Sequence, residues 1–239
     1  MKPLSRLAAL ALGFTLTATV LADQPDPLVL DHTSTALLIT DPQNDFLKEG
    51  GAAYGLVKDN LNRLGTIDNI ASLFQAAKEV ELPVFVSPHW YFPHDDHWKD
   101  RGALQQTIND IGMFKRTSVT DGSEFNGSGA DFYEPYKKYI YDGKTVISSP
   151  HKVYGPESND LVLQLRKRGI QTVLLGGMAA NLCTDSHLRE LVENGFRVVM
   201  IKDAVGAPGE AAYQAALTNY GMIANAVIST TEAVELISP

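Results

Sequence analysis

Short apolar runs alternate along the chain with longer segments in which apolar residues recur every three or four positions. The first pattern predicts buried strands and the second predicts amphipathic helices, and their alternation is typical of βαβ units around a parallel sheet. The predicted strands cover 35–40, 83–87, 144–148, 172–177, 197–201 and 226–230, and the predicted helices cover 61–80, 159–168, 182–194 and 210–220. Six strands joined by right-handed crossovers predict a three-layer α/β/α sandwich with a mainly parallel, Rossmann-like sheet.

Three of the predicted helices are followed by a glycine. Gly169, Gly195 and Gly221 each come at the end of the apolar periodicity. Glycine adopts the left-handed conformation that commonly ends a helix, so we expect helix stops at these positions.

The segment 88–142 breaks the alternation. It is rich in aromatic residues, histidine, aspartate and glycine and has only short helical patches. Segments of this length inside a compact domain usually form lids or binding loops. We therefore expect it to select the substrate.

The first 22 residues have the pattern of a signal peptide. Lys2 and Arg6 precede an apolar run over 7–21, and Val20 and Ala22 suit a cleavage site. An uncleaved anchor is the alternative, but the run contains three threonines and is shorter than the roughly 20 residues that span a bilayer. We expect cleavage to leave one exported domain, 23–239, in the periplasm or outside the cell, with no membrane attachment.

Charge limits the classes of partner. The net charge is −8, and acidic and basic residues are interspersed. This pattern argues against nucleic acid or anionic lipid as a partner and favours a small molecule. The G-x-G-x-x-G spacing of a phosphate loop is missing, so we expect no organic cofactor.

Cys183 is the single cysteine of the chain, so it has no partner for an intramolecular disulfide. It is a buried apolar residue, part of an intermolecular disulfide, or a reactive thiol. Asn181 is a candidate N-cap that would place Cys183 in the first turn of a helix. There the helix dipole and free N–H groups would lower the thiol pKa and hold an oxyanion.

Two further polar residues follow predicted strands. Asp41 follows 35–40 and Lys152 follows 144–148. Because ligands bind outside the carboxyl ends of strands in open α/β sheets, we expect both near Cys183. Asp41 would accept the thiol proton, and Lys152 would hold the anions in place. The alternatives are an Asx turn before Pro42 and a solvated surface amine.

The segments "LLITDPQNDF", "SSPHKVYGPESNDLVLQLRKRGI" and "GGMAANLCTDSHLRELVENGFRVVMIKDA" resemble the isochorismatase-like cysteine hydrolase superfamily, over about 28–234. The resemblance implies hydrolysis of a small amide or related C–N bond through a thioester, with a triad of Asp41, Lys152 and Cys183. It also implies a cis peptide within 178–180 that helps aim N–H groups at the oxyanion, and a homo-oligomer. The residues it places at the oxyanion are Met178, Ala179, Ala180 and Leu182.

Nicotinamidases of this superfamily place a divalent metal near an Asp-x-His pair after the second strand. This chain has Ser87, Pro88 and His89 there, so we expect no metal. The alternative is a metal held by His89, His94 and His97. Candidate substrate contacts are Phe46, His89, Trp90 and Tyr154.

Two other functions remain open from the sequence. One is hydrolysis of a vinyl ether with Asp41 as the acid, and the other is a catalytically silent α/β binding protein. A catalytic triad predicts rapid alkylation of Cys183 that persists below pH 7, and a silent fold predicts slow, ordinary labelling.

Overall fold

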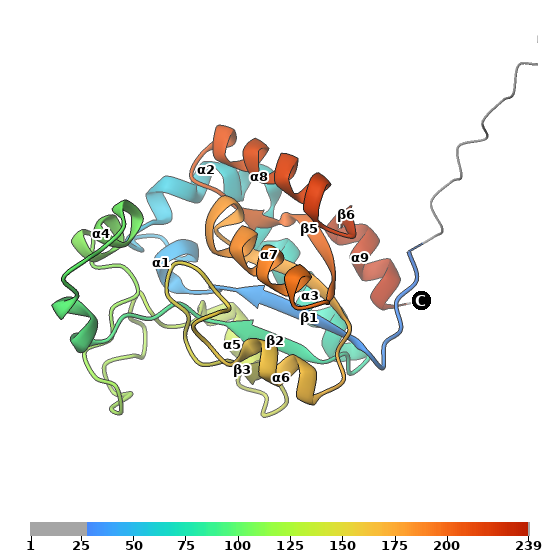
Figure 1. The fold of residues 1–239 in the computed structure, drawn as a ribbon, viewed down its shortest axis with the longest axis horizontal. Coiled ribbons are helices and arrows are strands. Elements are labelled where there is room, and N and C mark those ends of the chain that lie inside the picture. Colours follow the sequence, from blue (N-terminus) through green and yellow to red (C-terminus); the bar gives the residue numbers. More distant parts are fainter. Residues whose placement is uncertain (1–27, 239) are drawn as a thin grey trace, which may run out of the picture.

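The computed structural model describes residues 28–238. Six strands form one sheet in the order β3-β2-β1-β4-β5-β6, and every neighbouring pair is parallel, which confirms the predicted fold class (Figure 1). The strands are β1 (Thr35–Thr40), β2 (Val84–Ser87), β3 (Val146–Ile147), β4 (Thr172–Met178), β5 (Arg197–Gly206) and β6 (Ala226–Ile228). The proposed signal peptide lies outside the described residues.

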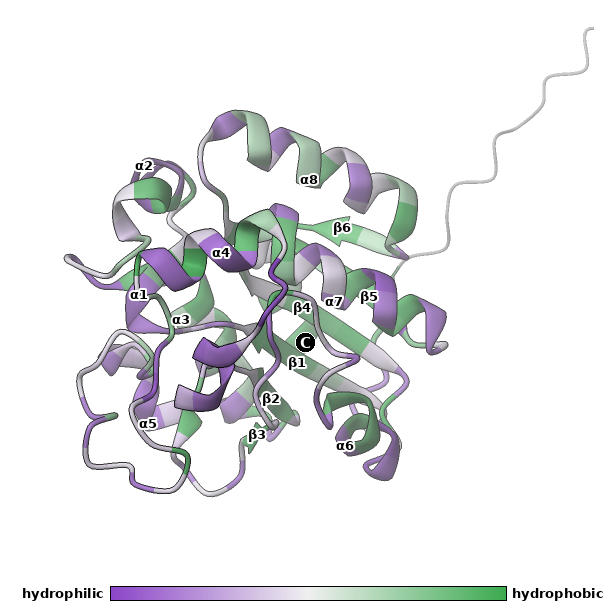
Figure 2. Ribbon diagram, turned by 60° about the vertical axis from the view of Figure 1, so that its left-hand side comes forward, coloured by the Kyte–Doolittle hydropathy of each residue, from purple (hydrophilic) through white to green (hydrophobic). Residues whose placement is uncertain are grey.

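Helices cover both faces of the sheet. The helices are α1 (Asn44–Leu47), α2 (Tyr54–Leu64), α3 (Thr66–Glu79), α4 (Ala103–Asp110), α5 (Lys137–Ile140), α6 (Leu161–Lys167), α7 (Asp185–Glu193), α8 (Glu210–Ile223) and α9 (Thr230–Ile237). Leu37 and Ile39 pack in one core with α2, α3 and α9. Ala36 and Leu38 pack in the other core with α6, α7 and α8. Alternate residues of β1 thus face opposite layers, and the hydrophobic strands lie between helices in Figure 2.

Two helix boundaries differ from the prediction. The segment predicted as one helix over 61–80 is divided at Gly65, which has φ 67° and ends α2 before α3 begins. The predicted stop at Gly221 is wrong, because α8 continues to Ile223. Gly221 has no neighbour near the position of a Cβ, so a glycine there is simply accommodated within the helix.

Helix α9 was missed in the sequence. Its N-cap is Ser229, whose hydroxyl accepts a hydrogen bond from the Glu232 N–H at 3.3 Å. Asp203, in β5, accepts from the Thr230 N–H at 2.7 Å. The predicted strand over 226–230 is too long, because the capping box of Ser229 and Glu232 turns the chain into a helix after Ile228. None of the described helices is long and apolar enough to cross a membrane.

The 88–142 segment begins at the carboxyl end of β2 and carries α4 and α5, the green part of Figure 1, and α5 packs against α3 beside the start of β2. Asp45, in α1, accepts hydrogen bonds from the Phe114 N–H at 2.6 Å and the Ala52 N–H at 3.1 Å. Burial raises the pKa of Asp45. This carboxyl thus fixes the segment over the end of the sheet.

Gly177 in β4 is a position where only glycine fits. Its φ is +118°, and an added Cβ would lie 2.2 Å from the Thr40 carbonyl oxygen. We expect Gly177→Ala to lower the free energy of unfolding by about 3 kcal/mol or more in urea titrations. Gly221→Ala is the control, and we expect it to raise stability by up to about 1 kcal/mol. Equal stability of the two variants would contradict this packing.

Candidate active site

Four buried polar side chains meet beyond the carboxyl ends of the strands. Asp41 directly follows β1, His89 follows β2, His151 follows β3, and Cys183 follows β4. Asp41, His89 and His151 have no exposed surface, and Cys183 is 4% exposed. The sheet topology therefore brings together Asp41 and Cys183, as expected, together with two histidines.

The segment that carries Cys183 is a π-helical turn, Ala180–Thr184, that leads into α7. Its N-cap is Ala179, so the predicted N-cap role of Asn181 is wrong. The peptide bond between Met178 and Ala179 is cis, within the segment where one was expected. Ala180 is buried, and its carbonyl accepts a hydrogen bond from the Tyr220 hydroxyl.

The Cys183 thiol has a raised pKa. Burial is the largest cause, and the negative charge of Asp41 is the second. The N–H groups of Ala179 and Cys183 act in the opposite direction and favour the thiolate. The predicted lowering of this pKa is therefore wrong, because desolvation and a nearby carboxylate outweigh the helix end. The thiol keeps its proton until a base accepts it.

Asp41 is placed to be that base. Burial raises its pKa, and the charge of His151 opposes this rise. Its Oδ1 lies 2.7 Å from Nε2 of His151, while Oδ2 has no hydrogen-bond partner among the described residues. A carboxylate with a raised pKa and one free oxygen beside a thiol is a suitable proton acceptor.

His151 occupies the place beside Asp41 where Lys152 was expected. Its Nε2 faces the Asp41 carboxyl, and its Nδ1 faces the backbone carbonyl of Lys152. A carbonyl oxygen only accepts, so Nδ1 carries a proton. A carboxylate also only accepts, so an ionised Asp41 requires a proton on Nε2 as well. His151 is thus placed to stabilise the negative charge of Asp41.

Lys152 itself does not reach Asp41. Its Nζ donates to the Trp90 carbonyl at 2.8 Å and to the Asp95 carboxyl, and it lies 5.0 Å from the centre of the Tyr91 ring. His151 forms a parallel bridge with His89, and successive side chains of an extended segment point in opposite directions. The sequence carries a signal for this choice: if the strand predicted over 144–148 is continued to His151 and Lys152, only one of these two side chains can face Asp41.

The other two histidines are held neutral. Burial lowers the pKa of His187 well below its usual range, and its Nδ1 donates to the Cys183 carbonyl at 2.7 Å. Its Nε2 lies 2.9 Å from the Ser87 hydroxyl. Burial likewise lowers the pKa of His89, whose Nδ1 lies 4.0 Å from the Cys183 sulfur. His187 thus fixes the turn that carries the thiol and adds no charge.

Gln43, the glutamine of the D-x-Q-x-D segment, holds His89 in place. Its Nε2 donates to the carbonyls of His89 at 3.0 Å and Ala130 at 2.7 Å, and its Oε1 accepts from the His89 N–H at 2.8 Å. This amide joins the end of β2 to the 88–142 segment, so the motif that begins with Asp41 also builds the wall of the site.

A pocket of about 100 Å³ opens at Cys183. It is lined by Phe46, Ala53, Leu56, Val57, His89, Leu104, Thr107, Ile108, Ile111, Met113, Phe114, Ala179, Leu182, Cys183 and Pro208. Of the expected substrate contacts, Phe46 and His89 line it. Trp90 instead donates to the Ala130 carbonyl, and Tyr154 is 60% exposed beside a separate surface hollow.

The structure does not bring together His89, His94 and His97, because His94 and His97 are exposed on the 88–142 segment. One atom each of His89, His151 and Cys183 lie within 4.8 Å of one another. Both ring nitrogens of His151 are already hydrogen-bonded, so a metal there would have to separate His151 from Asp41 or from the Lys152 carbonyl.

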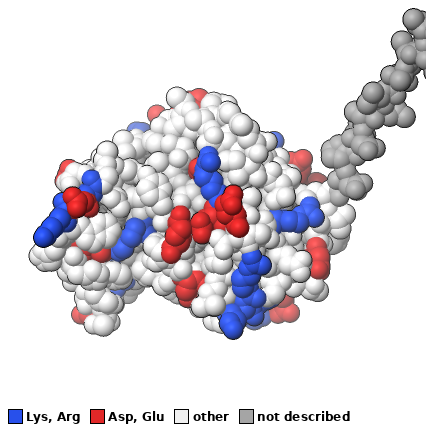
Figure 3. Space-filling view, in the orientation of Figure 1, with Lys and Arg blue, Asp and Glu red and all other residues white. Residues whose placement is uncertain are grey.

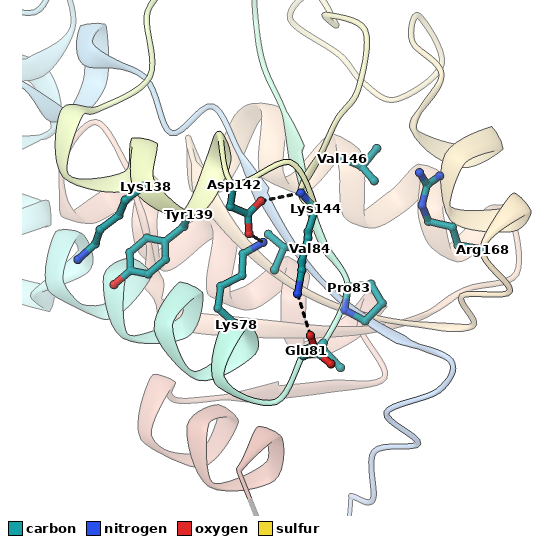
Figure 4. A pocket seen from close by; sticks show the side chains of 11 residues that line it. Lys78, Glu81, Pro83, Val84, Lys138, Tyr139, Asp142, Lys144, Val146 and Arg168 are labelled. Carbon is teal, nitrogen blue, oxygen red and sulfur yellow. Dashed lines mark hydrogen bonds and ion pairs between the residues drawn. The ribbon is translucent and has the colours of Figure 1, made fainter.

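A second hollow, of about 510 Å³, lies at the opposite end of β2 (Figure 4). Its cations are partly neutralised, since Lys78 lies 2.7 Å from Asp142 and Lys144 lies 2.7 Å from Glu81. Acidic and basic side chains also alternate over the face in Figure 3. This hollow lies at the start of β2, away from the carboxyl ends where Asp41 and Cys183 meet.

The raised thiol pKa predicts slow alkylation at neutral pH, so the expectation that a catalytic Cys183 is labelled rapidly below pH 7 is wrong. A free thiol is about 3% ionised at pH 7, and we expect Cys183 to react more slowly than free cysteine there. The rate should rise about tenfold per pH unit. Asp41→Asn removes the nearby charge and should speed labelling at a given pH. A rate that stays high and flat below pH 7, followed by mass spectrometry, would contradict the raised pKa.

Comparison with known proteins decides the family. The isochorismatase domain model matches residues 35–232. The chain belongs to the isochorismatase family. The RutB ureidoacrylate amidohydrolase of Variovorax paradoxus (strain S110) is 29% identical over 205 residues, which cover 82% of this chain and 78% of that protein.

Solved structures of two other hydrolases share the fold. A cysteine hydrolase from Pseudomonas syringae pv. phaseolicola 1448A has a TM-score of 0.71 at 22% identity and covers 90% of this chain and 98% of that one. N-carbamoylsarcosine amidase from Thermoplasma acidophilum has a TM-score of 0.58 at 18% identity and covers 82% and 96%. The match to the isochorismatase domain model confirms the expected superfamily, and at these identities the two structures support the fold alone.

Proposed function

We propose that this isochorismatase-family hydrolase cleaves the C–N bond of a small amide through a thioester on Cys183. The observation that carries the proposal is the buried pair of Cys183 and Asp41, whose side chains interact and both have raised pKa values, so that the thiol still holds its proton. The amidohydrolase activity for which the RutB relatives are named supports C–N chemistry.

In the first half of the reaction the thiol proton moves to Asp41 as the sulfur attacks the amide carbonyl carbon. The S–C bond forms, and the carbonyl oxygen becomes an oxyanion near the N–H groups of Ala179 and Cys183, which favour negative charge at this point. The C–N bond then breaks, and the proton on Asp41 passes to the departing amine or ammonia. An acyl thioester and a neutral amine result.

In the second half Asp41 accepts a proton from water, and the hydroxide attacks the thioester. The C–S bond breaks, the carboxylic acid leaves, and the proton returns to the sulfur. Asp41 alternates between acceptor and donor, for which a raised pKa is suited.

We propose that His151 provides the positive charge that the resemblance assigned to Lys152. Its contact with Asp41 Oδ1 directs the other oxygen, Oδ2, toward the reacting atoms and stabilises the carboxylate before the thiol proton arrives. His151 is a positioning residue, since it acts through Asp41.

The test compares wild type with Cys183→Ala and Cys183→Ser for release of ammonia from small carboxamides and ureido compounds, after circular dichroism shows that all three fold. We expect both variants to lose at least about 10³-fold in kcat, because neither side chain forms a thiolate. A Cys183→Ala variant with wild-type turnover would contradict the proposal.

We further propose that the protein works outside the cytoplasm as a homo-oligomer. The support for export is the pattern of residues 1–22. Cell fractionation and N-terminal sequencing test it: a mature chain that begins near residue 23 in the exported fraction is expected. An intact N-terminus in the cytoplasmic fraction would refute it.

A further inference from the structure

The pocket beside Cys183 is almost entirely apolar. Its inner wall is formed by buried side chains, among them Val57, Ile108, Met113 and Phe114. Polar groups are confined to Thr107, to His89 and to the thiol itself. A pocket of this kind recognises an apolar group by its shape.

No charged residue lines this pocket among the described residues. His89 is the one titratable wall residue besides the thiol, and its lowered pKa leaves it uncharged at neutral pH. Asp41, His151 and His187 lie behind the sulfur, and Lys152 is held by Asp95 and the Trp90 carbonyl. An anionic group placed in the pocket would therefore have no cation to pair with.

An unpaired carboxylate is costly to move from water into an apolar site, far more so than a neutral group of the same shape. The RutB relatives are named for ureidoacrylate, whose acrylate part is an anion at neutral pH. The wall of this pocket is not suited to such a group.

One polar atom does point to a ligand. Nε2 of His89 is buried and has no hydrogen-bond partner among the described residues, and its ring lines the pocket with Cys183. A neutral imidazole nitrogen can make one hydrogen bond to a carboxamide. The pocket therefore combines a polar end at the thiol with an apolar remainder.

The volume limits the size of the apolar part. The pocket beside Cys183 has a volume of only about 100 Å³. Sites for drug-sized ligands are several times larger.

From the lining and the volume, we infer that the substrate is a small, uncharged carboxamide with a branched or short aliphatic acyl group and no carboxylate. This inference rests on the proposed function, because it assumes that Cys183 attacks the amide. It assigns the acyl group to the apolar part of the pocket and the amide to the end of the pocket that Cys183 and His89 line.

The matched probes are isovaleramide and malonamate. Malonamate has two carboxylate oxygens at the positions where isovaleramide has two methyl groups of similar size. We expect kcat/KM for malonamate to be at least about 100-fold lower. Equal or preferred hydrolysis of malonamate, if it depends on Cys183, would overturn the substrate class and leave the proposed function intact.

Alkylation gives a second readout that does not need turnover. Because Cys183 is the single cysteine, labelling reports on this site alone. Each labelling rate of Cys183 is divided by the rate of free cysteine with the same reagent. On this relative scale iodoacetamide should label Cys183 at least about tenfold faster than iodoacetate. Isovaleramide should also slow the labelling more than malonamate does. Equal rates and equal protection would overturn the inference, even if no amide is hydrolysed.

A pair of variants tests the wall directly. Ile111 lines the mouth of the pocket and is 42% exposed, so it accepts a lysine. Leu163 on α6 is 55% exposed and does not line the pocket. We expect Ile111→Lys to raise the iodoacetate to iodoacetamide ratio at least about threefold, and Leu163→Lys to leave it unchanged. The same ratio in both variants would contradict the assignment of this pocket.

Discussion

Replacement of Asp41 by asparagine is expected to lower kcat by about 10³-fold to 10⁴-fold with little change in KM. The carboxamide has the same shape and keeps a contact with His151, but it cannot accept the thiol proton or return it to the amine. Steady-state kinetics on the best amide substrate measure the loss. Asp203→Asn is the control, because an asparagine at that position still accepts from the Thr230 N–H.

Two results would contradict this role of Asp41. A variant that retains kcat within about tenfold would mean that another group accepts the proton. A variant with unchanged kcat and a large rise in KM would make Asp41 a substrate-binding residue.

The second large effect is expected at His151. His151→Leu leaves Asp41 buried with no cationic partner, and we expect a loss of about 10²-fold to 10³-fold in kcat. His151→Lys restores a positive charge and should recover most of this loss.

Lys152→Gln separates the two candidates for the cation. Lys152 contacts Asp95 and the Trp90 carbonyl, so we expect this variant to change stability more than kcat. If Lys152→Gln loses more kcat than His151→Leu does, with the same fraction of each variant folded, the lysine acts in the reaction. A His151→Lys variant with a kcat as low as that of His151→Leu would likewise contradict a charged role for His151.

The strands were predictable because each is a short apolar run between polar segments. All six lie within a few residues of their predicted bounds. Helix boundaries were harder to predict, because each depends on the backbone conformation of one residue. Gly65 adopts the left-handed conformation and ends a helix, whereas Gly221 stays helical, and the two glycines look alike in the sequence.

The site was predictable only as far as the topology determines it. Asp41 and Cys183 meet because both follow central strands, and this rule needs no side-chain detail. The choice between His151 and Lys152 depends on which way one extended residue points. The thiol pKa depends on burial by the 88–142 segment and on a carboxylate distant in sequence, so reasoning from the local helix end gave the wrong direction.

The thioester on Cys183 is tested most directly by rapid-quench mass spectrometry. The protein turns over isovaleramide, the reaction is stopped with acid at a series of times, and the mass of the protein is measured. We expect a transient isovaleryl group on Cys183 that forms before isovaleric acid appears and does not form in Cys183→Ala. Product that forms at the full steady-state rate while Cys183 stays unmodified at every time point would contradict a thioester mechanism.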